Sequence, residues 1–210
     1  LGAAQAAAQR WLHLSDAEGQ PLLDSLNRFV DAGGLVLGIC NGFQLLVKLG
    51  VLPALDGKRF ERQVSLSHND SARYEDRWVQ LKPNPDSPCI FTKGLAVHGV
   101  LPMPVRHGEG KLVARDAATL QRLQDENLIA LHPETGEATQ EHPWNPNGSP
   151  LAIAGLTDPT GHILGLMPHP EAFHHATNHP GWTRGEVAVP GTALFANAVR
   201  YLRENPVNHS

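Results

Sequence analysis

Residues 35–44 read Leu35-Val36-Leu37-Gly38-Ile39-Cys40-Asn41-Gly42-Phe43-Gln44. Residues 35–39 form a short, continuously apolar run, which is typical of a strand buried on both faces of a parallel sheet. Apolar residues then return at helical spacing as far as Gly50, and this pattern predicts a helix from about Asn41. Cys40 therefore lies on a tight turn between a strand and a helix.

The residues around Cys40 indicate a nucleophile. Gly38 and Gly42 lie two positions away on either side, where small residues prevent clashes in the strained strand-to-helix turn of a nucleophile elbow. The start of the helix stabilises a thiolate, and the backbone N–H of Asn41 is placed to stabilise an oxyanion. The alternative is a buried structural cysteine at a strand end, which is common. The glycine spacing favours the nucleophile.

Other patterns place further elements around this turn. Apolar residues at helical spacing predict helices near residues 3–12, 22–30 and 194–202. Two apolar runs, 151–156 and 162–167, flank Asp158-Pro159-Thr160-Gly161, whose proline and glycine suit the turn of a β-hairpin. Residues 59–131 alternate over short segments and predict mostly strands and loops. The chain is thus expected to be a mixture of helices and strands.

A base for the cysteine is expected at His169, in Met167-Pro168-His169-Pro170-Glu171. The prolines favour extended backbone, in which residues two apart share a face. Glu171 is therefore expected to hold the imidazole of His169 while the imidazole pairs with the thiolate. The alternative is a solvated histidine and glutamate in a proline-rich loop, since the chain has twelve histidines.

Composition excludes several classes of protein. Lys and Arg number 17 against 21 acidic residues, and without a basic run we expect no nucleic-acid partner. No apolar run approaches the roughly 20 residues of a membrane span, so no membrane partner is expected. The two cysteines, Cys40 and Cys89, are far apart in the sequence and indicate a reducing compartment, which by default is the cytoplasm. Cys89 is expected to be an inert thiol in the core. The histidines at 174, 175 and 179 are expected in a solvated loop, not at a metal site.

Several segments together resemble a known family. Cys40 in its elbow and the later His169-Pro170-Glu171 resemble the catalytic triad of class I glutamine amidotransferase domains. Two further segments are similar to those of the glutaminase domains of phosphoribosylformylglycinamidine synthases, and they occur in the same order: His107-Gly108-Glu109-Gly110 and Asn145-Pro146-Asn147-Gly148-Ser149. The elbow is shared by all class I relatives, whereas these two segments single out the purine-biosynthetic members.

The resemblance implies a fold and a domain organisation. It implies a Rossmann-like or flavodoxin-like α/β fold with a mainly parallel central sheet flanked by helices. Relatives carry two strands, a helix and a glycine-rich loop before the elbow, and only 39 residues precede Cys40 here. We therefore expect residues 1–210 to be one class I glutamine amidotransferase domain that is truncated at its N-terminus and lacks its first strands.

The resemblance also implies an activity. Glutamine is hydrolysed to glutamate and ammonia through a thioester on Cys40, and ammonia passes to a synthetase domain or subunit that amidates formylglycinamide ribonucleotide. ATP and Mg²⁺ are expected in that synthetase partner, and no cofactor or metal in this chain. Gln44 matches a residue of the glutamine pocket, although it could instead bond its own helical turn. The alternatives are another class I amidotransferase, a γ-glutamyl hydrolase, or a non-catalytic fragment that docks to a synthetase.

Overall fold

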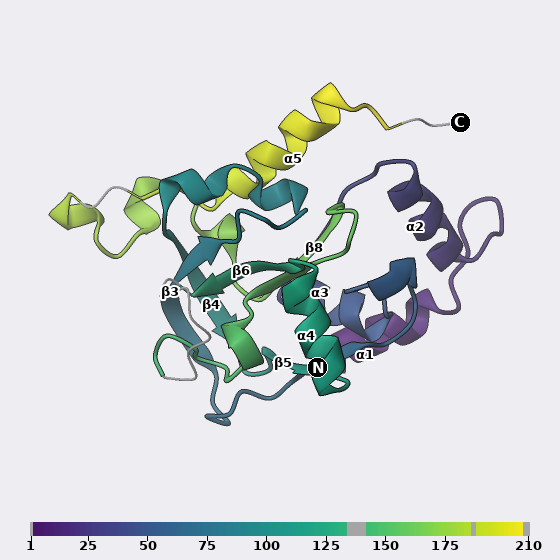
Figure 1. Ribbon diagram of the computed structural model, residues 1–210, viewed down its shortest axis with the longest axis horizontal. Coiled ribbons are helices and arrows are strands. Elements are labelled where there is room, and N and C mark those ends of the chain that lie inside the picture. Colours follow the sequence, from purple (N-terminus) through teal and green to yellow (C-terminus); the bar gives the residue numbers. More distant parts are fainter. Residues whose placement is uncertain (1, 134–141, 186–187, 208–210) are drawn as a thin grey trace.

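The computed structural model describes residues 2–133, 142–185 and 188–207 (Figure 1). Its α-helices are α1 (Gly2–Trp11), α2 (Leu22–Asp31), α3 (Asn41–Lys48), α4 (Ala117–Asp125) and α5 (Thr192–Glu204). Its strands are β1 (Val36–Ile39), β2 (Val64–Ser67), β3 (Glu75–Pro83), β4 (Leu101–His107), β5 (Lys111–Ala114), β6 (Ile129–Pro133), β7 (Gly155–Thr157) and β8 (Ile163–Leu166). Short 3₁₀ helices include η2 (Ile90–Thr92), η4 (Pro150–Ala152), η5 (Pro170–Ala172) and η6 (Ala176–Asn178).

The described strands form a six-stranded sheet and a two-stranded ribbon. The order in the large sheet is β1-β8-β7-β6-β3-β4, and β2 pairs with β5 in the ribbon. β1 runs parallel to β8, with Ile39 opposite Leu166, and every other pair within the described residues is antiparallel. The parallel pair places the carboxyl ends of β1 and β8 at the same edge of the sheet.

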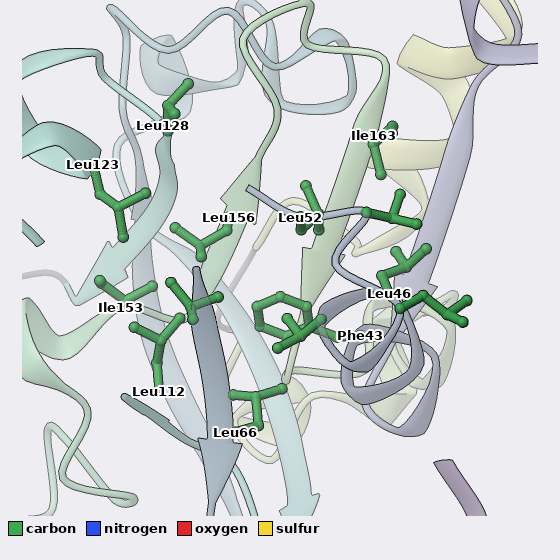
Figure 2. Close-up of a cluster of buried hydrophobic side chains, with 14 of the residues drawn as sticks. Phe43, Leu46, Leu52, Leu66, Leu112, Leu123, Leu128, Ile153, Leu156 and Ile163 are labelled. Atoms are coloured by element: carbon green, nitrogen blue, oxygen red, sulfur yellow. The ribbon is translucent and has the colours of Figure 1, made fainter. Parts of the chain in front are cut away.

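Apolar side chains cover both faces of the large sheet. On one face, Ile163 of β8 and Leu156 of β7 pack in a cluster that also takes in α3, β2, β5 and α4 (Figure 2). On the other face, Leu164 and Leu166 of β8 pack with β3, β4, β6 and Leu194 of α5. The alternation along β8 follows from the two-residue period of a strand. In Figure 1, α5 lies across the molecule from α1.

Most of the predicted elements are present. The helices expected near residues 3–12, 22–30 and 194–202 correspond to α1, α2 and α5, and the expected elbow joins β1 to α3. Gly33, which follows α2, and Gly50, which follows α3, adopt left-handed φ angles of 94° and 73°. The expected hairpin is the antiparallel pair β7 and β8, although residues 151–154 lie before β7. The α/β class is confirmed.

Three expectations differ from the structure. Only the β1–β8 pair is parallel among the described strands, so the sheet is mixed and not mainly parallel. The connection between β7 and β8 is too short for the crossover that a parallel pair needs, so these two strands pair antiparallel. β1 is half-buried, not buried on both faces, because β8 is the only described strand that pairs with it. The expectation of mostly strands and loops over residues 59–131 omitted α4, which begins where the side chain of Asp116 accepts the N–H of Thr119.

A core substitution tests this packing. Leu156 of β7 is fully buried, so Leu156→Ala is expected to lower the free energy of unfolding by about 2–5 kcal/mol, since it removes packed methyl groups and leaves a cavity. Val199→Ala on α5, where the valine is 50% exposed, is the control and should change it by less than about 1 kcal/mol. Urea denaturation measures both. Equal losses for the two variants would contradict the assigned core.

Candidate active site

Cys40 lies at the carboxyl end of β1 and caps the N-terminus of α3. Its backbone N–H donates to the carbonyl of Leu166 at 2.8 Å, and its own carbonyl accepts the N–H of Gln44 at 3.0 Å. Its φ angle is 50° with ψ at −102°, a strained combination for a residue with a side chain. The half-buried sulfur lies 3.9 Å from the carbonyl oxygen of Arg106. The strand and helix thus hold Cys40 in the sharp turn of a nucleophile elbow.

The two glycines of the elbow play unequal roles. A Cβ on Gly38 would lie 2.6 Å from Cδ1 of Leu46 and 2.8 Å from the backbone carbon of Gly42, so only glycine fits there. A Cβ on Gly42 would meet no atom within 4 Å. The prediction that both glycines prevent clashes is therefore right for Gly38 and wrong for Gly42. The backbone of Gly42 lies close to Gly38, but a side chain on Gly42 itself would point into open space.

His169 reaches the site from the neighbouring strand. It follows β8 by three residues, and its backbone N–H donates to the carbonyl of Pro104 in β4 at 2.8 Å. Nδ1 of His169 lies 2.6 Å from Oε1 of Glu171. The expected contact is present, but Glu171 lies in the 3₁₀ helix η5 and not in an extended segment. A turn, and not strand alternation, brings the carboxylate back to the imidazole.

The surroundings of His169 favour its protonated form. The Cys40 thiol is the strongest influence that raises the pKa of His169, the Glu171 carboxylate also raises it, and burial opposes both. Nε2 of His169 is buried and makes no aligned hydrogen bond within the described residues. Long or poorly aligned contacts of this kind are common between catalytic groups in free enzymes. The arrangement can hold a thiolate beside an imidazolium.

Gln44 and Asn41 lie on the first turn of α3. The side chain of Gln44 is buried, and its Nε2 donates to the carbonyl of Glu109 at 2.7 Å, so the alternative in which it bonds its own turn is wrong. Asn41 is the first residue of α3, and backbone N–H groups at this position have no partner within a helix. Its place beside Cys40 is compatible with the predicted oxyanion donor.

Two further side chains of the site were not among the residues predicted for it. His107, at the end of β4, is buried, and burial lowers its pKa to about 4, with a smaller contribution from the nearby His169. Asn69 is also buried, and its Oδ1 lies 3.2 Å from Nδ1 of His107. Local patterning gave no reason to single out Asn69, since polar residues between strands are usually solvated. Only its burial in the fold distinguishes it.

The remaining cysteine and histidines lie elsewhere. Cys89 is fully buried, and burial raises the pKa of its thiol. His175 caps η6 by accepting the N–H of Thr177. The ring of His179 is buried and packs edge-on against Trp78, so the expectation of a solvated loop is wrong for His179. Over residues 2–133, 142–185 and 188–207, no group of three or more His, Cys, Asp or Glu side chains converges as metal ligands. In the same part of the chain, no helix is long and apolar enough to cross a membrane.

Comparison with known proteins agrees with this geometry. Residues 1–202 match the family described as the CobB/CobQ-like glutamine amidotransferase domain. The chain belongs to this glutamine amidotransferase family. The domain is 40% identical over 185 residues to phosphoribosylformylglycinamidine synthase subunit PurQ of Dehalococcoides mccartyi, covering 86% of the chain and 69% of that protein. It is 36% identical over 197 residues to the same subunit of Methanococcus maripaludis, covering 87% and 72%.

A solved structure shares the fold of this amidotransferase domain. The structure of PurLQS from Thermotoga maritima matches with a TM-score of 0.59 and 26% sequence identity, and the match covers 87% of this chain and 69% of that chain. Sequence and fold therefore agree that the chain is a glutamine amidotransferase, which is a class of enzyme.

The unequal glycines of the elbow lead to a paired test. Gly38→Ala is expected to lower the free energy of unfolding by about 1–3 kcal/mol and to slow alkylation of Cys40, because its Cβ would displace the backbone of Gly42. Gly42→Ala should keep or slightly raise stability, since alanine favours a helix by up to about 1 kcal/mol. Urea denaturation and iodoacetamide labelling measure the two effects. Equal tolerance at both positions would contradict the close approach found at Gly38 and not at Gly42.

The protonation of His169 is open to direct titration. Its pKa should lie above the ordinary 6.5, so that the imidazole stays protonated to higher pH than a free histidine. Cys40→Ala and Glu171→Gln should each lower this pKa, since each removes a group that favours the imidazolium, with the larger change in Cys40→Ala. NMR titration of the imidazole resonances measures the three values. An unchanged pKa in both variants would rule out the coupling.

Proposed function

We propose that this chain is the glutaminase subunit of a phosphoribosylformylglycinamidine synthase, and that it hydrolyses glutamine to glutamate and ammonia. The observation that carries the proposal is the meeting of Cys40 and His169 at the ends of two paired parallel strands, with Nδ1 of His169 held 2.6 Å from Glu171. The names of the PurQ relatives support the choice of reaction.

The proposed chemistry follows from these three side chains. The thiolate of Cys40 attacks the side-chain amide carbon of glutamine, while the backbone N–H of Asn41 stabilises the oxyanion. Nε2 of His169 delivers the thiol proton to the departing ammonia and leaves an acyl thioester on Cys40. Water then attacks the thioester with His169 as base, which releases glutamate and restores the thiol. Glu171 keeps the proton of the neutral imidazole on Nδ1, so that Nε2 faces the sulfur.

The proposed partner performs the rest of the reaction. A synthetase chain uses the ammonia, with ATP and Mg²⁺, to convert formylglycinamide ribonucleotide to its amidine, and this chain itself needs no cofactor or metal. The PurLQS neighbour supports a complex of this kind. Gln44 forms part of the glutamine pocket, because its amide lies against the turn that borders the thiol. We place the complex in the cytoplasm, where purine synthesis and reduced thiols are expected.

Removal of the thiol tests the proposal. With the synthetase, its nucleotide substrate, ATP and Mg²⁺ present, Cys40→Ala should lower glutamine-dependent formation of the amidine by roughly 10⁴-fold or more, since the nucleophile is absent. Amidine formation from added ammonium should be unchanged. Cys89→Ala is the control, because that thiol is buried away from the site and the variant should retain glutamine-dependent activity.

A second readout separates the alternatives. Diazo-oxo-norleucine, a glutamine mimic, should label the wild type at Cys40 and leave Cys40→Ala unlabelled, as judged by mass spectrometry. Glutaminase activity that never supports the synthetase would favour another amidotransferase or a γ-glutamyl hydrolase. Synthetase binding without labelling or turnover by the wild type would instead establish a non-catalytic docking subunit.

A further inference from the structure

The turn at residues 107–110 forms a wall of the site beside the thiol. It begins where β4 ends, next to Arg106, whose carbonyl oxygen lies 3.9 Å from the sulfur of Cys40. The carbonyl of Glu109 accepts the hydrogen bond from Nε2 of Gln44 at 2.7 Å. The position of this turn therefore decides where the amide of Gln44 lies and how much room remains next to the sulfur.

Asn69 holds this turn through several hydrogen bonds. Its Nδ2 donates to the carbonyl of His107 at 2.8 Å and to that of Arg73 at 2.9 Å. Its Oδ1 accepts the N–H of Gly110 at 3.0 Å, and its backbone N–H donates to the carbonyl of Gly108 at 3.0 Å. Only 3% of Asn69 is exposed. One buried side chain and its own N–H thus bond to both ends and the middle of the turn.

The same amide sets the state of His107. Two carbonyl acceptors fix which atom of the Asn69 amide is nitrogen, so Oδ1 faces Nδ1 of His107 and accepts from it. His107 therefore carries its proton on Nδ1, and its low pKa keeps it neutral. A Cβ on Gly110 would overlap Cε1 of this imidazole, so the ring and the turn are in direct contact.

Asn147 holds the far end of the turn. Its Nδ2 donates to the carbonyl of Gly110 at 2.9 Å, and its Oδ1 accepts the N–H of Ser149 at 3.0 Å. Its own carbonyl accepts the N–H of Asp70, the residue after Asn69, at 3.2 Å. Asn147 is 5% exposed. The two asparagines therefore belong to one buried network around Gly110.

The segment that carries Asn147 is held in a strained shape. Leu151 and Ala152 are consecutive residues with side chains, yet their φ angles are 55° and 48°. Left-handed backbone of this kind costs about 1–3 kcal/mol per residue and persists only where the surroundings impose it. Gly148 has a φ of 77°, and a Cβ there would overlap Oδ2 of Asp70. The fold thus maintains a costly conformation that places Asn147 against the turn.

We propose that Asn69 and Asn147 are positioning residues for glutamine binding. They hold the turn at residues 107–110 against Gln44 and beside the sulfur of Cys40, and so set the affinity for glutamine without touching the reacting atoms. The inference rests on the proposed function, since it takes glutamine as the ligand of this site. A residue with only a structural role would change stability, whereas a positioning residue also changes the affinity for glutamine.

Three alanine variants test the inference. Asn69→Ala and Asn147→Ala should each raise the KM for glutamine by about tenfold, because in each variant the turn that fixes Gln44 loses at least one buried hydrogen bond, and kcat should stay within about threefold of the wild type. Asn197→Ala is the matched control, because Asn197 is equally buried and its Nδ2 donates to the carbonyls of Phe91 and Lys93 at 2.9 Å each, between α5 and η2. It should lose comparable stability in urea and keep the wild-type KM.

Calorimetric binding of glutamine separates this inference from the proposed function. If the wild type binds glutamine but releases no ammonia, the proposed function fails, and the dissociation constants of the variants still decide the inference. Weaker binding in Asn69→Ala and Asn147→Ala than in Asn197→Ala supports it, and equal binding in all three overturns it. If Asn69→Ala does not fold, Asn147→Ala decides alone, since it removes one bond to the turn. A wild type that binds no glutamine overturns both proposals.

Discussion

The parallel pairing of β1 with β8 determines where the proposed nucleophile and its base lie. Because the two strands point the same way, the chain leaves them at one edge of the sheet, with Cys40 after β1 and His169 after β8. The N–H of Cys40 donates to Leu166, which fixes the first residue of the elbow to the neighbouring strand. The ring of Phe43 packs on Gly165, where a Cβ would overlap it, and so holds the start of α3 on the same strand. A shift of one residue in this register would turn every side chain of β1 to the opposite face.

Apolar packing covers the sheet that contains this pair of strands, whereas buried hydrogen bonds hold the turn beside the site. Apolar side chains from both halves of the chain cover the two faces of the sheet and provide most of the burial. The buried asparagines Asn69 and Asn147 lie instead at one turn, where each of their side-chain polar atoms has a partner. Buried polar groups with complete hydrogen bonding favour a single conformation, whereas an apolar contact tolerates small shifts. These hydrogen bonds therefore restrict the turn at residues 107–110 to a single conformation.

Local sequence patterns predicted the parts of the site that depend on neighbouring residues. The elbow at Cys40 and the pairing of His169 with Glu171 each involve a few consecutive residues, so the partners could be predicted locally, although a 3₁₀ turn and not extended backbone joins His169 to Glu171. Asn69 was not predicted, because its partner His107 lies 38 positions later in the chain and nothing nearby marks Asn69 as buried. The half-buried state of β1 was missed for a related reason. The number of strands that pair with a strand is a property of the whole sheet, and an apolar run alone does not reveal it.

The left-handed backbone of Cys40 has a consequence for the evolution of the fold. Its φ of 50° suits glycine better than any residue with a side chain, so the proposed nucleophile occupies the position at a cost in stability. A lineage in which the thiol is no longer needed would gain stability by drifting to glycine at this position, and the rest of the sheet would be unaffected. In the proposed function, activity and stability therefore place opposite demands on this one residue.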